Sequence, residues 1–313
     1  MVNVGIDVSK DNLDVKILPS GEFHHIPNDK KGVKKLVKIL TKIFPELIVI
    51  EPTGGYEKLA YNTLSQAGLK VALVNPKRVR SFATAINKLA KTDKIDAEVL
   101  AKFGELIKPP VRPIPDKELT ALQAKIRRRT DLVIMKTAES NRLAVSADEV
   151  KQEITEHIKF LNNTIKRIEK EVSKELKEIP EIWKKVQLLQ EVPGVGTILA
   201  ITLILELPEL GQLSNKEITA LAGLAPITRE SGKFKGKKSI YGGRKELRTA
   251  LYMPIVSAIS HNPSIKDFYN RLINKGKLAK VALTACMRKL LVILNSIMKN
   301  ETKWNPQHNT VTV

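Results

Sequence analysis

Four acidic side chains occupy positions where a carboxylate needs a chemical reason. Asp7 lies between apolar residues near the end of a predicted strand, and Glu51 ends a continuous apolar run. Asp93 and Asp96 follow Thr92, a favourable helix N-cap, so that both project from one face of a helix. A carboxylate inside a strand is costly unless it is solvated, paired or bound to a metal.

Together these four acids predict a site for two divalent cations. Two strand-end carboxylates and a helical carboxylate pair are the ligand set that holds two ions about 4 Å apart for phosphoryl transfer. Ligands that are all hard oxygens favour Mg²⁺ or Mn²⁺. Each acid also has a plain structural interpretation: Asp7 as a turn residue, Glu51 as the partner of a helix dipole, and the aspartate pair as a solvated first helical turn. Their joint occurrence in one region of a basic chain favours the metal site.

The pattern around these acids predicts a mixed α/β domain over residues 1–108. Period-two alternation indicates strands, and apolar residues at steps of three and four indicate helices. The expected elements are strands at 2–8, 13–18 and about 22–26, a helix at 30–44, a strand at 47–50, a helix from Gly54-Gly55 to Leu64, a strand at 70–74, and helices at about 76–89 and 92–106.

A Pro-rich stretch, 108–115, ends this region, and residues 116–180 are predicted to form a helical connector. Apolar residues of its second half recur at steps of four and three: Ile154, Ile158, Leu161, Ile165, Ile168, Val172 and Leu176. This heptad pattern predicts a coiled coil, in its simplest form an antiparallel helical hairpin available for self-association. A helix pair buried inside one compact domain is the alternative.

Residues 181–300 are predicted to form a mainly helical domain, followed by a tail at 301–313. Its Pro193-Gly194-Val195-Gly196 segment lies between two apolar helical patterns, which is typical of a helix-hairpin-helix element. The two glycines, Gly194 and Gly196, would let backbone N–H groups approach a phosphate. An ordinary corner between two helices has the same composition.

A basic segment rich in Gly and Ser, 228–245, contains three hydroxyl groups that could act as nucleophiles: Ser231, Ser239 and Tyr241. Chemistry alone does not choose among them. Cations in and after this segment are predicted to bind nucleic-acid phosphates: Lys233, Lys235, Lys237, Lys238, Arg244 and Arg248. A flexible hairpin that grips the DNA backbone nonspecifically would explain the lysines equally well.

The overall composition indicates a polyanionic partner. Lys and Arg total 53 against 33 Asp and Glu, a net charge of +20, although 42% of residues are hydrophobic and can form real cores. Such a balance favours nucleic acid over lysine as surface filler. A single cysteine, Cys286, excludes an internal disulfide and is expected in the core. We expect a cytoplasmic protein, since no leader is visible and the apolar run from Ile198 to Leu205 is too short to span a membrane.

These residues resemble the DEDD insertion-sequence transposases of the "IS one-ten" family, whose first domain is similar to the Holliday-junction resolvase RuvC, an RNase H-like fold. The matching segments run in order along nearly the whole chain: Gly5-Ile6-Asp7-Val8-Ser9-Lys10, Glu51-Pro52-Thr53-Gly54-Gly55-Tyr56, Lys91-Thr92-Asp93-Lys94-Ile95-Asp96-Ala97, Val192-Pro193-Gly194-Val195-Gly196, Leu221-Ala222-Gly223-Leu224-Ala225-Pro226, Ser231-Gly232 and Gly242-Gly243-Arg244.

The resemblance implies a tetrad of metal ligands, here Asp7, Glu51, Asp93 and Asp96. It also implies a nucleophilic serine before a glycine, which selects Ser231, and a serine-linked DNA intermediate. Its implied partners are double-stranded DNA at the element ends and target, and a noncoding guide RNA. We further expect a homo-oligomer, a dimer or a tetramer, in which one composite site joins the two domains of one or of two subunits.

Three other interpretations remain open. A metal-dependent nuclease or junction resolvase would use the same carboxylates with metal-activated water and leave Ser231 idle. A kinase-like ATPase also opens with Gly-Ile-Asp-Val, but its later phosphate loop is not found and a charge of +20 does not suit it. A non-catalytic DNA-binding protein would not need all four acids.

Overall fold

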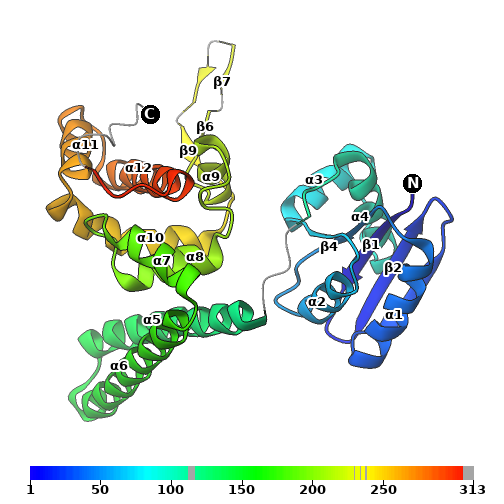
Figure 1. Cartoon of the computed structure of the whole chain (residues 1–313), viewed down its shortest axis with the longest axis horizontal. Coiled ribbons are helices and arrows are strands. Elements are labelled where there is room, and N and C mark those ends of the chain that lie inside the picture. The colour runs from blue at the N-terminus through cyan, green and yellow to red at the C-terminus, as the bar shows by residue number, and fades with distance from the viewer. Residues whose placement is uncertain (112–116, 229, 233, 237, 306–313) are drawn as a thin grey trace. The chain divides into compact units, whose positions relative to one another are not determined.

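The chain folds into two compact units, Met1–Asp116 and Lys117–Val313 (Figure 1). The computed structural model describes residues 1–111, 117–228, 230–232, 234–236 and 238–305. Part of the predicted Pro-rich boundary and residues 306–313 of the predicted tail therefore lie outside the described residues. Each unit is described by itself.

The first unit is built on a five-stranded mixed sheet in the order β3-β2-β1-β4-β5. Neighbours β1–β2 and β2–β3 are antiparallel, whereas β1–β4 and β4–β5 are parallel. Its elements are β1 Asn3–Val8, β2 Asn12–Leu18, β3 Phe23–Pro27, α1 Lys30–Ile43, β4 Leu47–Ile50, α2 Lys58–Gln66, β5 Val71–Leu73, α3 Pro76–Ala85 and α4 Asp93–Ile107. The predicted mixed α/β arrangement is confirmed.

Strand alternation divides the side chains of this sheet between two cores. Val4, Ile6 and Val8 of β1 pack in the same core as the buried residues of α1 and α2. Leu47 and Val49 of β4 pack in the other core, with α3 and α4. Alternation along β1 therefore points its remaining side chains, including that of Asp7, to the face that α4 covers.

Helix α4 lies directly on the backbone of β1. A Cβ atom added to Gly5 would overlap the carbonyl oxygen of Ala97 and the backbone nitrogen of Ala101. Further along the helix, a Cβ on Gly104 would lie 3.6 Å from Asn3 Oδ1, at the start of β1. The helix thus runs opposite to the strand, and its first turn lies over the carboxyl end of β1.

We expect Gly5→Ala to destabilise the first unit by about 3 kcal/mol or more, because the new methyl group meets backbone atoms that no side-chain rotation can move. Gly54→Ala is the matched control: Gly54 has a φ of 64° with open space around it, so only the left-handed backbone cost of about 1 kcal/mol applies. Urea unfolding of both variants measures the difference. Equal losses of stability would contradict the close contact between α4 and β1.

Helix α2 begins at Lys58, four residues later than the predicted start at Gly54. Gly54 and Gly55 have φ values of 64° and 108°, which a helix excludes, and they form a turn. The side chain of Glu57 accepts hydrogen bonds from the backbone N–H groups of Thr53 and Gly55, both at 2.9 Å, and closes this turn.

The second unit opens with a long helical hairpin, α5 Lys117–Val145 and α6 Asp148–Lys177 (Figure 1). An ion pair joins Arg129 to Glu169 at 2.8 Å, and the side chain of His157 lies 3.5 Å from that of Glu139, a register that only antiparallel helices allow. The half of α6 near the rest of the unit buries its apolar residues in the main core of the unit, from Leu161 onward. At its tip the hairpin leaves Val145 and Val150 85% and 44% exposed. One half of the hairpin therefore packs in the core of the second unit, and the other half projects from it.

The remainder of the second unit is a helical bundle with short strands. Its elements are α7 Pro180–Gln190, α8 Thr197–Glu206, α9 Asn215–Leu221, β6 Pro226–Ile227, β7 Glu230–Ser231, β8 Phe234–Lys235, β9 Ser239–Ile240, α10 Lys245–His261, α11 Pro263–Asn274 and α12 Ala279–Asn300. Among the described residues, α12 is the one helix long and apolar enough to cross a membrane, but 56% of its apolar stretch is buried inside the unit. It is the central core helix and contains the fully buried Cys286, as predicted.

Candidate active site: a carboxylate cluster and a serine hairpin

Asp7 and Glu51 lie side by side at the carboxyl ends of neighbouring strands. β1 and β4 are parallel, and Ile6 is the register partner of Ile50, so the next residue of each strand comes to the same edge of the sheet. Alternation places both carboxylates on the face that α4 covers. The structure therefore brings together two acids that are distant in the chain.

Asp93 and Asp96 join them from the first turn of α4. Thr92 caps this helix by accepting a hydrogen bond from the backbone N–H of Ile95 at 3.3 Å, as its position predicts. Because α4 runs opposite to β1, this first turn faces Asp7.

Electrostatics shows that these carboxylates share one environment. Burial raises the pKa of Asp7 to about 6, and the negative charges of Asp96, Asp93 and Asp14 add to the rise, against a lowering hydrogen bond from its neighbour's N–H. Burial also raises the pKa of Glu51, with Asp7 and Asp96 as the next causes. Four acids that repel one another in a partly buried site favour a bound cation.

Two basic side chains also act on this cluster. Burial raises the pKa of Asp96, while the charges of Lys91 and Arg80 oppose the rise. Lys91 likewise lowers the pKa of Glu51, although burial and its acidic neighbours prevail there. Lys91 and Arg80 therefore reduce the repulsion between the carboxylates but do not cancel it, since the pKa values of Glu51 and Asp96 remain raised.

The donor set fits a hard divalent cation, since all four predicted ligands are carboxylates, and the pKa values of Asp7, Glu51 and Asp96 are raised in the absence of a cation. Within the part of the chain that the structure describes, no group of three His, Cys, Asp or Glu side chains is close enough to hold a metal ion as the side chains stand. Side-chain rotation would thus have to accompany metal binding by Asp7, Glu51, Asp93 and Asp96.

Asp14 is a further member of this site that sequence reasoning missed. It is the cross-strand partner of Asp7 on β2, its side chain is 6% exposed, and its Oδ1 lies 2.7 Å from Nδ1 of His25, its own partner on β3. His25, Asp14, Asp7 and Glu51 therefore form a row across four strands. The signal was a single acid alternating with Leu13 and Val15 in a strand, which resembles the context of Asp7.

The predicted nucleophile Ser231 lies on a segment of antiparallel strands between α9 and α10 (Figure 1). We call this segment, residues 226–240, the serine hairpin. β6 pairs with β9, and further out β7 pairs with β8. Ser231 and Ser239 are exposed on it, and Tyr241 is 55% exposed beside it. Of the predicted basic residues, Lys238 is exposed, Lys235 lies in β8 with its side chain outside the description, and Lys233 and Lys237 lie outside the described residues.

Gly194 and Gly196 lie in the turn that joins α7 to α8. Gly194 has a φ of 94°, and a Cβ atom there would lie 2.8 Å from Cα of Ala258, so the turn packs closely on α10. The amide side chain of Asn262 donates to the carbonyl oxygen of Pro193 at 3.2 Å and fixes the turn from the same side. Gly196 begins α8 with open space around it.

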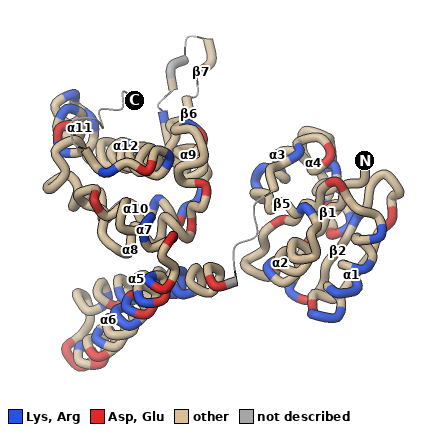
Figure 2. Tube along the Cα trace, viewed as in Figure 1, with Lys and Arg blue, Asp and Glu red and all other residues tan. Residues whose placement is uncertain are grey.

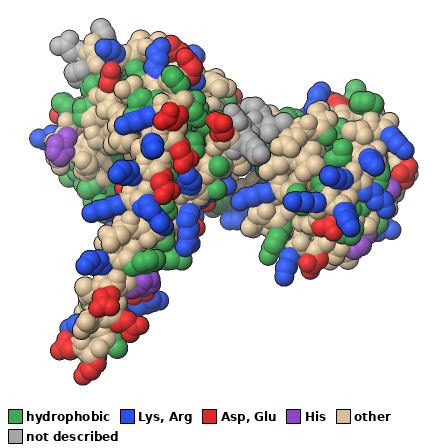
Figure 3. Space-filling view, turned by 60° about the horizontal axis from the view of Figure 1, so that its bottom comes forward, with side chains coloured by type: hydrophobic (Ala, Val, Ile, Leu, Met, Phe, Trp, Pro, Cys, Tyr) green, Lys and Arg blue, Asp and Glu red, His purple; other side chains and the backbone are tan. Residues whose placement is uncertain are grey.

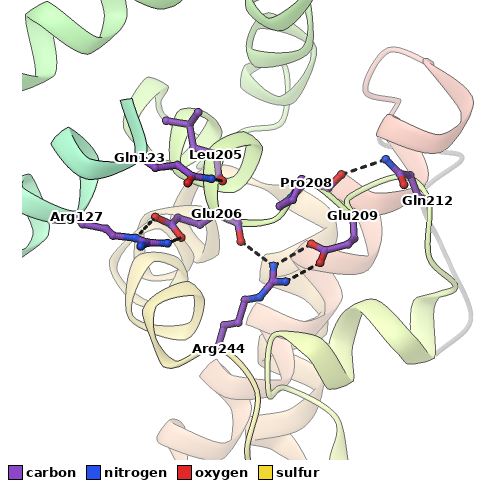
Figure 4. A network of polar contacts seen from close by, with 8 residues as sticks. All are labelled: Gln123, Arg127, Leu205, Glu206, Pro208, Glu209, Gln212 and Arg244. Atoms are coloured by element: carbon purple, nitrogen blue, oxygen red, sulfur yellow. Dashed lines mark hydrogen bonds and ion pairs between the residues drawn. The ribbon is translucent and has the colours of Figure 1, made fainter. Parts of the chain in front are cut away.

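Arg244 and Arg248 bind other parts of the protein. Figure 4 shows the guanidinium of Arg244 between Glu209 and the carbonyl oxygen of Glu206. Its two hydrogen bonds to the Glu209 carboxylate are 2.9 and 2.6 Å long, and the bond to the Glu206 carbonyl is 2.7 Å. Arg248 donates to the carbonyl oxygen of Gly242 at 2.5 Å.

A basic surface of the first unit was not singled out from the sequence. Helix α1 has no acidic residue, and Figure 2 shows its lysines along the helix. All six of them are exposed: Lys30, Lys31, Lys34, Lys35, Lys38 and Lys42. They lie on the side of the sheet away from the carboxylates, because α1 packs in the opposite core from α4.

Both units match known protein families. Residues 4–151 match a family model described as "Transposase", the DEDD type of IS110 elements. Residues 186–270 match the model described as "Transposase IS116/IS110/IS902 family". The chain thus belongs to the class of DNA transposases. More particularly, it carries two transposase domains of the IS110 family and belongs to that family.

Relatives resemble the chain over most of its length. It is 29% identical over 310 residues to "Pilin gene-inverting protein" of Moraxella bovis, with 95% of each chain covered. It is 26% identical over 287 residues to "Transposase for insertion sequence element IS1328" of Yersinia enterocolitica, which covers 79% of this chain and 81% of the relative. A DNA-recombining enzyme that binds DNA is therefore the class of function, and the kinase-like interpretation is wrong.

Proposed function

We propose that the chain is a transposase and site-specific DNA recombinase in which Asp7, Glu51, Asp93 and Asp96 bind two Mg²⁺ or Mn²⁺ ions and Ser231 attacks DNA. The observation that carries this proposal is the convergence of the four acids on one edge of the sheet, where burial and neighbouring acids raise the pKa values of Asp7, Glu51 and Asp96. When bound, the ions would stabilise the charge that develops on the scissile phosphate.

The protein's own groups would carry the covalent step. A bond forms between Ser231 Oγ and phosphorus as the hydroxyl gives up its proton, the bond from phosphorus to one deoxyribose oxygen breaks, and the leaving oxygen takes up a proton. Attack by the hydroxyl of another strand then reverses these changes and frees the serine. The phosphodiester energy is conserved, so no nucleotide hydrolysis is needed.

The basic surfaces suit nucleic-acid partners. Exposed lysines of α1 and Lys238 of the serine hairpin would neutralise phosphates of the element ends and the target. A noncoding guide RNA is proposed from the family resemblance alone. Since relatives are named for gene inversion, we also propose that recombination takes place at defined DNA sites. We propose that the protein acts in the cytoplasm.

The projecting helical hairpin supports a homo-oligomer, either a dimer or a tetramer. Hydrophobic side chains show on the surface of the hairpin between charged ones (Figure 3). Ile134, Met135 and Phe160 are 59%, 44% and 63% exposed there. Apolar side chains in this setting favour a partner helix pair.

A recombination assay tests the proposal. Purified protein is incubated with a plasmid that carries element ends and target, with and without the RNA transcribed from the element's flank. We expect recombinant junctions with Mg²⁺ or Mn²⁺, none with EDTA, and none without the RNA. Junctions that form in EDTA would contradict the role of the carboxylates, and junctions that form without RNA would remove only the guide.

The second candidate function is a nuclease or junction resolvase that uses metal-activated water, which the same carboxylate cluster would serve. A nicked substrate that traps intermediates separates the two: a covalent protein–DNA species supports the recombinase, and free cleaved ends alone support the nuclease.

A further inference from the structure

The two ends of the serine hairpin meet at three glycines, Gly223, Gly242 and Gly243, which we call its neck. Gly223 follows α9 and Gly242 and Gly243 precede α10, with φ values of 67°, 69° and 68°. A Cβ atom on Gly243 would overlap the backbone of Gly223, and one on Gly223 would overlap the carbonyl oxygen of Gly242. The two ends of the hairpin therefore pass in direct backbone contact, which glycine alone permits.

An ion pair locks this neck to the body of the unit. Arg244, the residue after the glycines, donates its backbone N–H to the Leu221 carbonyl at 2.9 Å and two side-chain N–H groups to the Glu209 carboxylate. The side chains of Arg244 and Glu209 are only 18% and 22% exposed. A two-pronged contact of this kind fixes direction as well as distance.

The same contact reaches the long helical hairpin. The 206–209 segment that receives Arg244 also presents the Glu206 carboxylate to Arg127 of α5, at 2.7 and 2.8 Å (Figure 4). Gln123 of α5 donates to the carbonyl oxygen of Leu205 next to it. One short segment thus holds both the α5 helix and the neck of the serine hairpin.

We propose that Arg244 and Glu209 are positioning residues that set the direction of the serine hairpin for strand exchange, and that Arg244 does not contact DNA. Its charge is matched by Glu209 and its N–H groups are directed into the protein, so little attraction remains for a phosphate. The proposal rests on the proposed role of Ser231. A nucleophile displaced by about 1 Å loses on the order of a hundredfold in rate.

Two single substitutions and their combination test this. If Arg244 and Glu209 act as positioning residues, Glu209→Gln and Arg244→Gln each lower the strand-exchange rate, measured at saturating DNA, at least about tenfold. Their DNA affinity and its salt dependence, measured by fluorescence anisotropy, stay unchanged. The charge-swapped variant Arg244→Glu with Glu209→Arg recovers most of the lost rate. Lys238→Gln is the matched control and should weaken binding and reduce the salt slope by about 1.

Limited trypsin digestion adds a readout that does not need activity. The single variants should be cut at Lys238 faster than wild type, and the charge-swapped variant at the wild-type rate. The proposal would be overturned if Arg244→Gln weakened DNA binding and reduced the salt slope as Lys238→Gln does, while Glu209→Gln kept the wild-type rates of strand exchange and digestion. Absence of strand exchange by the wild-type protein would contradict the proposed function, while digestion and salt slope would still decide the role of Arg244.

Discussion

Asp7→Asn is expected to lower metal-dependent strand cleavage on the order of a thousandfold while DNA binding remains. Asp7 lies at the centre of the row of acids, between Asp14 on one strand and Glu51 on the other, and faces the first turn of α4. Its carboxylate interacts electrostatically with those of Glu51, Asp93 and Asp96, the other three proposed ligands. Cleavage of a labelled DNA strand with Mg²⁺ measures the loss.

The same substitution should raise the stability of the metal-free protein. Folding raises the pKa of Asp7 from 3.8 to about 6, mainly through burial and then through Asp96 and Asp93. The folded state therefore binds more protons between these values, and stability falls as pH rises through this window, by about 3 kcal/mol at most. Asn carries no charge, so the variant should lose this slope and be more stable than wild type at pH 7.

Thermal unfolding in EDTA and in Mg²⁺ measures both effects. Mg²⁺ should raise the melting temperature of wild type at pH 7 and leave that of Asp7→Asn unchanged. Asp11→Asn is the matched control, since Asp11 lies exposed in the turn after β1. Full cleavage by Asp7→Asn, or an equal Mg²⁺ shift in wild type and variant, would exclude Asp7 as a ligand.

Ser231→Ala is expected to abolish the covalent protein–DNA adduct and recombination, with DNA affinity unchanged. The side chain is exposed on the serine hairpin, so loss of its hydroxyl leaves the fold intact. Without Oγ no bond to phosphorus can form, and the phosphodiester energy cannot be stored. A nicked suicide substrate followed by denaturing electrophoresis detects the adduct.

Ser239→Ala and Tyr241→Phe are the controls, since both side chains are close to Ser231 in the chain and exposed. Each should form the adduct at the wild-type level. An adduct that persists in Ser231→Ala and disappears in one of the controls would move the nucleophile to that residue. Cleavage without any adduct in the wild type, with oxygen from labelled water in the product, would support the nuclease instead.

Local patterns in the sequence predicted most elements correctly. The alternation around Asp7, the apolar run before Glu51 and the Thr92 cap depend on neighbours within four residues, and the structure has all three. The predicted start of α2 was wrong. A Gly-Gly pair in the sequence is compatible with a turn or with the start of a helix, and in the structure both glycines have positive φ values and form a turn. The family itself was recognisable because its motifs are short and ordered along the chain.

Interactions between distant segments needed the folded chain. Asp14 joins the carboxylate row only because β2 pairs with β1 in one register out of several, and a shift by one residue would turn its side chain to the other face. Arg244 has its partner Glu209 35 residues earlier in the chain, so a pattern of basic residues could not show that its charge is already matched. Sequence established which chemical groups are present and on which element each lies, since both depend on near neighbours. Tertiary packing decided which groups meet, because strand register and helix crossing join residues that the chain order separates.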